Sequence, residues 1–570
     1  MDRAITVTMD MHMQLGASNS QRNIKAVYAK CASAFVLTLL TSSAMANKLT
    51  IDGEVNIVTA YRDIDSDGQS GGISSLSVVP GLYTSYKSKK LFFRGNVNTT
   101  YVKRDTDAAG TSEDYFTNYN YQSRLSLIEN LLTFEVKGDR QYRASEINNL
   151  FVTDFVNNSD GLVKTEQNSA TLSLETKRGK LVNIEGSARY ARVTADGGSQ
   201  VVVNNVSNDL VNADLSLKSG VKSRIIWNID GSYDNTVTST NQGQDQTSQS
   251  VNALVDVPVF KGLALRFTGT DSSNEFGAKG TENTITREFQ TYGAGLTMYF
   301  SENTYISVTY NNASNPTIGP QNEIENEDET FIGIDLIWTL SPRTFIAYNR
   351  SRRFYGDSSG GRLQYQTRKT RATLSYTETV TNASQLIATE QQGLFICPAG
   401  ATDILSCSVS ETLDYEPQAD EVLVNFAIPD YAIEDFALLR RSTTAALAFD
   451  FNRLSVGVNA SYVDSDSLAN VSSQQRNATS GSMSLGYKVG SQSSLNMAVR
   501  YIDLDRLIEN TEQSSRSKSI SLSFSRAIGR RLKAAFTYSY TDRNGNFSEN
   551  IFGTSYKDNR LNLSVIYTTE

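Results

Sequence analysis

Alternation of apolar and polar residues with a period of two is the feature that most limits how this chain can fold. In residues 519–525, Ile520, Leu522 and Phe524 share one face, and serines occupy the other. The same alternation recurs in residues 483–489, 495–501, 532–540 and 561–567. A period of two is typical of β-strands with one apolar and one polar face. Because a soluble β-sandwich would also alternate, the spacing of the turns has to separate the two fold classes.

Tight turns recur at regular intervals along the chain. Their signals fall near residues 88, 130, 178, 220, 261, 302, 342, 452, 490 and 529, with longer polar segments between them. The one long gap predicts a further tight turn near residue 382. Eleven tight turns and twelve long loops predict about 24 strands, within a range of roughly 20 to 26. Short periplasmic turns that alternate with long extracellular loops are typical of bacterial outer-membrane barrels.

The predicted fold is therefore all-β, a single large antiparallel up-and-down β-barrel that spans residues 47–570. Aromatic residues within a few positions of the tight turns support a membrane location, because interfacial girdles of aromatic side chains flank the apolar band of such barrels. The predicted girdle consists of Tyr86, Phe92, Phe260, Tyr299, Phe300, Tyr305, Trp338, Phe345, Phe449, Phe451 and Tyr487. The sequence thus predicts an integral protein in the outer membrane of a Gram-negative bacterium.

The first 46 residues have the pattern of a signal peptide that is removed after export. Arg22, Lys25 and Lys30 precede the apolar run 31–40, and the small residues 44–46 follow it. The run is too short to cross a bilayer as a helix, and no later run reaches the roughly 18 apolar residues that a spanning helix needs.

Composition excludes several classes of function. The net charge is −8 and no basic domain is present, so nucleic acid is not an expected partner. The single histidine, His12, lies in the predicted leader, which leaves the mature chain without a Ser-His-Asp relay or a histidine-bearing zinc site. No phosphate-binding or dinucleotide-binding glycine motif occurs. We therefore expect neither catalysis nor a bound cofactor, apart from the calcium alternative considered below.

Two segments carry a resemblance to a known family. Residues 341–380 contain "SPRT" in a turn, "RRFYGDS" at a loop and "QTRKTRATLSYTE" on the return strand, and residues 421–455 contain "LLRRSTTAALAFDFNRLS". In these segments the chain resembles the PEP-CTERM-system-associated outer-membrane β-barrels. That resemblance implies a role in the export or assembly of extracellular polysaccharide, with its export machinery as partner. It supplies no catalytic or binding residues.

The same stretch gathers positive charge, which is unusual in an acidic chain. With turns at 342 and 382, Arg350, Arg352 and Arg353 on one strand and Arg368, Lys369 and Arg371 on the next would meet at the extracellular rim. Arginine binds phosphate in a bidentate manner, so contact with lipopolysaccharide phosphates is one interpretation. An anionic polymer that leaves the pore is a second. Internal pairing is a third, because residues 323–329 and 411–435 are rich in Asp and Glu.

Two smaller features are candidate sites. Cys397 and Cys407 lie in a long acidic loop, at about residues 397–436, and a disulfide between them is expected in an oxidising compartment. Asp63, Asp65 and Asp67, in "DIDSDG" after the first predicted strand, have the spacing of a calcium-binding loop. The twelfth position is Ser74 rather than Glu, so a solvated acidic turn is the alternative.

The function that the sequence favours is a passive conduit for polysaccharide, whose lumen is gated by the acidic loop. The alternative is a non-conducting structural barrel that anchors surface polymer through its loops. Expected partners are outer-membrane lipid and lipopolysaccharide, and the sequence does not indicate an oligomeric state.

Overall fold

In the computed structural model, the residues described lie between 48 and 569. Within that range the following residues are not described: 67–69, 107–109, 145–161, 177–178, 180, 197–205, 221–222, 240–243, 279–283, 302–303, 319–323, 383–384, 386–394, 399–407, 410–420, 425–436, 469–474, 509–510 and 547–553. The predicted signal peptide and Asp67 therefore lie outside the described part of the chain. Residues 50–570 form the compact unit that contains the barrel.

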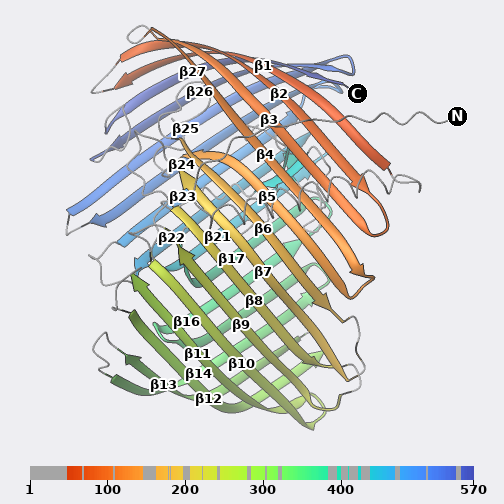
Figure 1. The fold of residues 1–570 in the computed structure, drawn as a ribbon, viewed down its shortest axis with the longest axis vertical. Helices are drawn as coiled ribbons and strands as arrows, with labels where there is room; N and C mark the ends of the chain where they lie inside the picture. The colour runs from red at the N-terminus through yellow and green to blue at the C-terminus, as the bar shows by residue number, and fades with distance from the viewer. Residues whose placement is uncertain are drawn as a thin grey trace, which may run out of the picture. The chain divides into compact units, whose positions relative to one another are not determined.

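Twenty-four strands form one sheet in the order of the sequence (Figure 1). The first twelve are β1 (Lys48–Ser66), β2 (Ser70–Lys87), β3 (Leu91–Thr106), β4 (Gly110–Ile128), β5 (Leu132–Ala144), β6 (Leu162–Glu175), β7 (Val182–Asp196), β8 (Val206–Ser219), β9 (Ile226–Thr238), β10 (Gln244–Phe260), β11 (Leu263–Ala278) and β12 (Thr284–Ser301). The others are β13 (Thr304–Ile318), β14 (Ile324–Ser341), β15 (Thr344–Arg353), β16 (Gly356–Gln366), β17 (Thr370–Thr381), β21 (Leu438–Phe451), β22 (Leu454–Ser467), β23 (Gln475–Lys488), β24 (Ser493–Ile508), β25 (Thr511–Ile528), β26 (Leu532–Gly545) and β27 (Tyr556–Thr568).

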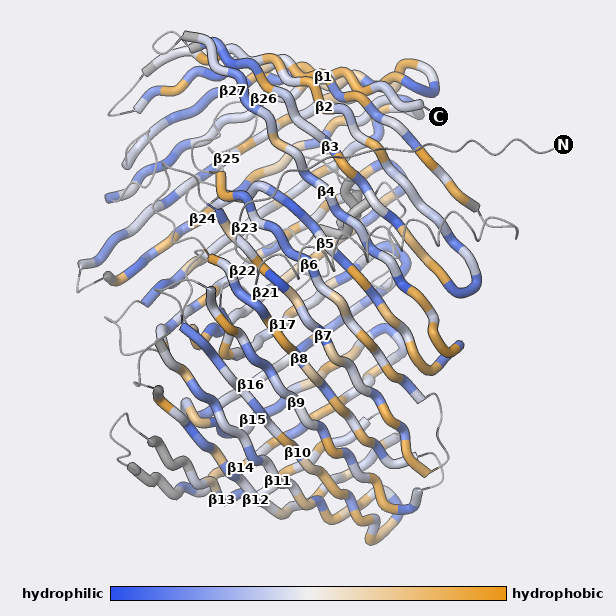
Figure 2. The backbone as a smooth tube through the Cα atoms, in the orientation of Figure 1, coloured by the Kyte–Doolittle hydropathy of each residue, from blue (hydrophilic) through white to orange (hydrophobic). Residues whose placement is uncertain are grey.

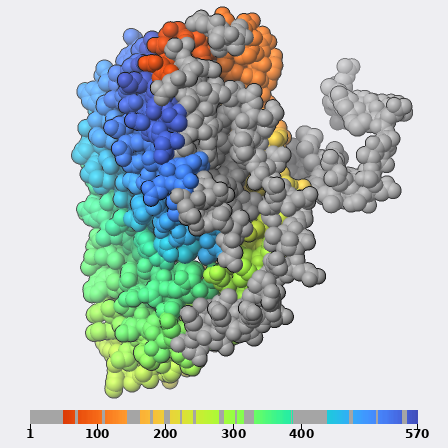
Figure 3. All heavy atoms as spheres, turned by 90° about the vertical axis from the view of Figure 1, so that its left-hand side faces the viewer, coloured from red at the N-terminus to blue at the C-terminus, as the bar shows by residue number. Residues whose placement is uncertain are grey.

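The sheet closes on itself through its first and last strands. β1 pairs with β27 in antiparallel register from Glu54↔Thr568 to Ser66↔Tyr556, and these first and last strands lie side by side in Figure 3, red next to blue. A separate three-stranded sheet, β18 (Phe395–Pro398), β19 (Ser408–Val409) and β20 (Glu421–Val424), lies in the connection between β17 and β21. The prediction of a closed barrel of about 24 strands is confirmed.

Ten of the eleven predicted tight turns are found where the sequence places them. The strands on either side are separated by only a few residues, for example between Phe260 and Leu263 and between Ile528 and Leu532. Gly262 and Gly529 have φ angles of 81° and 79° there, a left-handed conformation that glycine adopts at little cost. The sequence spacing therefore locates one end of the barrel well.

The predicted turn near residue 382 is wrong. The tight turn after β16 lies between Gln366 and Thr370, where the Thr370 N–H donates to the Thr367 hydroxyl at 3.0 Å. At the opposite end only two residues, Phe354 and Tyr355, join β15 to β16, and no long loop is present there. β15, β16 and β17 are consequently the shortest strands of the barrel.

Hydrophobic residues on the strands point away from the interior. Val55, Ile57, Leu215, Phe267 and Leu522 are exposed, whereas the residues between them are polar or small. Figure 2 shows the resulting mixture of hydrophobic and hydrophilic residues along the strands. A closed sheet satisfies every backbone hydrogen bond internally, and an outward apolar face matches a lipid environment. The chain is therefore an integral outer-membrane β-barrel, with its tight turns on the periplasmic side.

The aromatic girdle is only partly as predicted. Phe260, Phe300, Phe451 and Tyr487 are exposed near the tight turns, in agreement with the prediction. Tyr299 and Tyr305 instead turn inward and hydrogen-bond to carboxylates, as described below. Among the residues that the structure describes, no helix is long and apolar enough to cross a membrane.

Candidate functional site: the inner wall of the barrel

The inner face of the barrel is lined mainly by small hydroxyl and amide side chains. On β25 the inward positions are a continuous row: Ser515, Ser517, Ser519, Ser521, Ser523 and Ser525. Neighbouring strands add hydroxyl groups in register, so that Ser523 and Thr537 lie 2.9 Å apart (Oγ to Oγ1) and Ser461 and Ser480 lie 2.6 Å apart (Oγ to Oγ). These residues occupy the polar positions of the two-residue alternation in the sequence. They make this arc of the inner wall hydrophilic.

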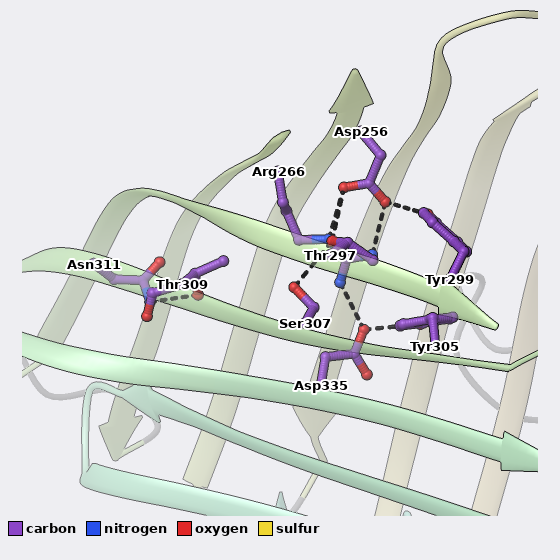
Figure 4. A network of polar contacts seen from close by, with 9 residues as sticks. All are labelled: Asp256, Arg266, Thr297, Tyr299, Tyr305, Ser307, Thr309, Asn311 and Asp335. Atoms are coloured by element: carbon purple, nitrogen blue, oxygen red, sulfur yellow. Dashed lines mark hydrogen bonds and ion pairs between the residues drawn. The ribbon is translucent and has the colours of Figure 1, made fainter. Parts of the chain in front are cut away.

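A buried ionic network binds five strands together near the periplasmic turns (Figure 4). Arg266 on β11 donates through Nε and Nη2 to both carboxylate oxygens of Asp256 on β10, at 2.8 and 2.7 Å. Its Nη1 donates to Asp335 on β14 at 2.9 Å. Asp256 is fully buried, and the side chain of Arg266 is 4% exposed. A bidentate arginine–carboxylate pair of this kind fixes both distance and orientation.

Hydroxyl groups on β12 and β13 complete the network. The Tyr299 hydroxyl donates to Asp256, and the Tyr305 hydroxyl donates to Asp335 at 2.8 Å. Thr297 donates to Asp256 at 3.2 Å, and the Arg266 guanidinium lies 5.1 Å from the centre of the Tyr305 ring. Two carboxylates thus share one guanidinium, and tyrosine and threonine hydroxyls donate further hydrogen bonds to the same carboxylates. The arrangement braces β10–β14 rather than presenting a free charged group.

A second buried ion pair lies at the closing seam. Arg62 on β1 donates through Nε to Asp558 on β27 at 2.9 Å, and both side chains are fully buried. Arg560 donates through Nε to the other carboxylate oxygen of Asp558 at 2.6 Å. Two guanidinium groups therefore surround one carboxylate where the first and last strands meet.

A groove of about 590 Å³ lies at the periplasmic part of β6–β10. Its lining includes Glu185, Asp214 and Asp230 together with several serines. Lys218 donates to Glu185 at 2.8 Å, whereas Asp230 accepts a hydrogen bond from the Ser216 hydroxyl at 2.6 Å. This part of the wall is acidic and polar.

An apolar cluster lies on the inner side at the extracellular end. Phe354, at the β15–β16 connection, packs against Phe276, Phe289, Ala313 and Ala437. The Arg287 guanidinium lies 5.9 Å from the centre of the Phe354 ring. The cluster draws the short hairpin inward and ties it to β11, β12 and β13.

The predicted cluster of positive charge does not exist as a single site. Arg350, Arg352 and Arg353 lie at the extracellular end of β15, but Arg368 and Lys369 lie in the tight turn between β16 and β17, and Arg371 follows at the start of β17. The two halves are therefore at opposite ends of the barrel. The error follows directly from the misplaced turn near residue 382.

Two of the three arginines in the extracellular half of that cluster, Arg350 and Arg352, pair with acidic side chains. Arg350 donates to Asp357 at 3.1 Å. Arg352 pairs with Glu329, and with Asp357 at 3.6 Å. Glu329 belongs to the acidic segment 323–329, so for Arg352 the structure matches the internal-pairing alternative.

The remaining predicted site residues are only partly described. Cys397 lies on β18, whereas Cys407 lies outside the described residues. β18 pairs with β19 as Phe395↔Val409 and Ile396↔Ser408, and the disulfide between Cys397 and Cys407 stays a prediction. Asp63 and Asp65 lie on β1, opposite Asn559 and Lys557, because this strand extends further than predicted. Among the described residues, no group of three or more His, Cys, Asp or Glu side chains is arranged to hold a metal ion.

Sequence reasoning missed both buried networks. On the inward face Asp256 lies between Leu254 and Pro258, and Asp335 lies between Gly333 and Ile337. A single charge among uncharged residues of one strand face was a usable signal. Arg62 and Asp558 are 496 positions apart. Their contact becomes predictable only once the register of the closing seam is known.

Comparisons with known proteins show only distant similarity. No family model matches the chain, and no curated protein matches it. Among solved structures, the chain is similar to the FrpB iron transporter from Neisseria meningitidis (9% identity, 91% of this chain and 81% of that chain, TM-score 0.37). It is also similar to the siderophore receptor PirA from Acinetobacter baumannii (9%, 91% and 81%, TM-score 0.39) and to OprD from Pseudomonas aeruginosa (9%, 91% and 96%, TM-score 0.29). These likenesses are weak, and the barrel assignment rests on the strand pairing of the chain itself.

Proposed function

We propose that this protein is a passive outer-membrane conduit whose cargo is an extracellular polysaccharide. The observation that carries the proposal is the hydroxyl-lined inner wall, above all the six-serine row on β25 and the paired hydroxyls of β22, β23 and β26. Such a surface is wetted by water and exchanges hydrogen bonds readily with sugar hydroxyls. The resemblance of residues 341–380 and 421–455 to exopolysaccharide-associated barrels points to the same class of cargo.

The strand number supports a wide passage. With neighbouring strands about 4.8 Å apart and tilted by about 40°, a circular section of 24 strands has a backbone radius of roughly 24 Å. Small inward side chains cannot fill such a section, so water, a loop or a passenger occupies it. A hydrated polymer chain fits within these dimensions.

A non-conducting scaffold is the second candidate, and specific observations favour it. The apolar cluster around Phe354 lies on the inner side at the extracellular end. In addition, β19, in the long connection, approaches β22. A permanent plug would require inward-packed side chains near the extracellular end, as in the first feature, and a connection held against the barrel wall, as in the second.

Single-channel conductance in planar bilayers separates the two functions. The refolded wild-type protein is compared with a variant that lacks residues 400–434, most of which lie outside the described part of the chain. A conduit gated by this loop gives low or flickering wild-type conductance and a large, steady conductance in the deletion variant. If neither protein conducts, although both show the heat-dependent gel mobility of a folded barrel, the conduit proposal fails and the scaffold remains.

A further inference from the structure

The tight turns at the periplasmic end of the barrel carry a strong positive charge. By sequence, the eleven connections between barrel strands at this end contain 14 Lys or Arg residues and two Glu residues. The twelve connections at the extracellular end contain one Lys residue and 19 Asp or Glu residues. Since the net charge of the whole chain is −8, the positive charge at the periplasmic end is a local feature.

One sector of the periplasmic end, between β14 and β26, is called the basic rim below. Its turns are residues 342–343, 367–369, 452–453, 489–492 and 529–531. These turns contain no Asp or Glu. Their cations are all exposed to solvent: Arg343, Arg368, Lys369, Arg453, Arg530 and Arg531.

The backbone of these turns is attached to the barrel wall. The carbonyl oxygens of Arg343, Lys369 and Arg453 each accept a hydrogen bond at 2.8 Å from a backbone N–H of the next strand along the rim. The carbonyl oxygen of Arg531 accepts one from Thr568 at 2.9 Å. The cations are therefore held around the mouth of the barrel and not on independent loops.

The positive charge continues from the turns onto the inner wall. Lys488 and Lys533 are exposed, and they occupy the faces of β23 and β26 that carry the hydroxyl groups described above. One inward carboxylate, Asp450, lies beside them. The outward positions next to these turns are mostly apolar, as at Tyr487, and Arg526 is an exception. The basic rim thus faces the mouth and the lumen, whereas lipid headgroups would be bound by cations on the outward face.

The wall of β6–β10 has the opposite charge. The groove described above is lined by Glu175, Glu185, Asp214 and Asp230, and Lys218 is paired with Glu185. An anionic ligand at the periplasmic mouth is therefore attracted to the β14–β26 side and repelled from the β6–β10 side.

We propose that the basic rim is the entry site for an anionic polysaccharide that carries carboxylate groups on its sugar units. This inference rests on the proposed conduit function and specifies its substrate class and its end of entry. Exposed cations around a mouth raise the local concentration of an anionic ligand and its rate of association. Guanidinium groups bind carboxylates in a bidentate manner, and the serine row of β25 meets the sugar hydroxyls farther along the wall. The acidic connections at the extracellular end disfavour entry from outside.

The test counts transient blockades of single-channel current in planar bilayers of zwitterionic lipid at about 0.1 M salt. The probe is a short oligogalacturonate, which carries one carboxylate per sugar unit, added to each side of the bilayer in turn. A neutral dextran oligomer of the same length is the comparison. The rim variant removes four exposed cations: Arg368→Gln/Lys369→Gln/Arg453→Gln/Arg530→Gln.

We expect the wild-type protein to show more frequent oligogalacturonate blockades from one side than from the other. In the rim variant the frequency from that side should fall roughly tenfold, because the cations that steer the probe are absent. The frequency of dextran blockades should not change. At about 1 M salt, where the Debye length is about 3 Å, the wild type and the rim variant should behave alike.

The matched control removes four exposed cations from the outward face in the extracellular half of the barrel: Lys103→Gln/Arg192→Gln/Lys518→Gln/Lys557→Gln. It changes the net charge by the same amount and is expected to resemble the wild type. Equal blockade frequencies in the wild type and the rim variant overturn the inference. An equal fall in the control variant also overturns it, because net charge alone then accounts for the effect.

Two further outcomes separate the basic rim from the conduit function and from lipid. If phosphatidylglycerol in the bilayer abolishes the difference between the wild type and the rim variant, lipid phosphate occupies the basic rim and the inference is overturned. If the wild type does not conduct, the conduit function fails. The basic rim is then tested by calorimetric titration of oligogalacturonate into protein in zwitterionic micelles. Binding that the rim variant loses and the control keeps supports the anionic ligand, and absence of binding overturns it.

Discussion

The buried ion pair at the closing seam gives the sharpest stability prediction. Asp558→Asn keeps the shape of the side chain but removes the negative charge that two guanidinium groups share. Arg62 and Asp558 are fully buried and Arg560 is 11% exposed, so solvent screens these charges poorly. Removal of one partner from a buried pair typically costs about 3–5 kcal/mol. We expect a loss of this size in the free energy of unfolding.

The matched control is Asp503→Asn, in a pair that also joins neighbouring strands. Asp503 on β24 accepts hydrogen bonds from Arg516 on β25 at 3.0 and 3.2 Å, but the Arg516 side chain is 58% exposed. Solvent-exposed pairs contribute about 0–1 kcal/mol. The same chemical change is therefore expected to have little effect at this second position.

The assay is urea unfolding of protein refolded into detergent micelles. The signals are the fluorescence of Trp227 and Trp338 and the heat-dependent gel mobility of the closed barrel. Midpoints are compared only where unfolding and refolding curves coincide. If Asp558→Asn and Asp503→Asn lower the stability by the same small amount, burial does not strengthen this pair, and the reasoning is refuted.

Three further predictions follow from other parts of the barrel. Arg266→Met leaves Asp256 and Asp335 without their shared guanidinium and is expected to lower the free energy of unfolding by about 3–5 kcal/mol. Adding Asp256→Asn to the same chain should restore part of that loss. Additive effects of the two substitutions in a double-mutant cycle would contradict the coupling. Cys397 and Cys407 are expected to form a disulfide worth roughly 2–3 kcal/mol, so alkylation of the denatured, unreduced protein should leave both unlabelled, whereas labelling of both would exclude the bond. In a background with Cys397 and Cys407 replaced by serine, Arg353→Cys should react with a membrane-impermeant maleimide in intact cells, and Lys369→Cys should react only after the outer membrane is opened. Equal labelling in intact cells would contradict their placement at opposite ends.

Much of the architecture was predictable because a barrel repeats one simple physical rule. Each strand exposes apolar residues to lipid and polar residues to the interior, so a period of two and regularly spaced turns predict both the strand number and closure. The failure at residues 366–370 has a local cause. The segment Gln366–Thr370 contains no Gly, Pro, Asn or Asp, and its turn depends on the Thr367 side chain instead.

The inner-wall contacts were less predictable, for a different reason. Asp256, Arg266 and Asp335 lie on separate strands, and only the cross-strand register brings their inward positions together. A single sequence indicates the face of each residue but not its neighbour on the next strand. The basic cluster is an example. Because one turn was predicted at the wrong residue, Arg368, Lys369 and Arg371 were assigned to the extracellular end, whereas they lie at the periplasmic end.

The unequal strand lengths have a mechanical consequence. Six cross-strand residue pairs join β16 to β17, whereas thirteen join β1 to β27. The seam between the first and last strands is thus not the one with the fewest residue pairs. Under heat or lateral tension we expect neighbouring strands to separate first at the extracellular edge beside the β15–β16 hairpin, because the fewest residue pairs join the strands there. The β1–β27 seam is expected to stay closed, because the buried ion pair of Arg62 and Asp558 lies across it.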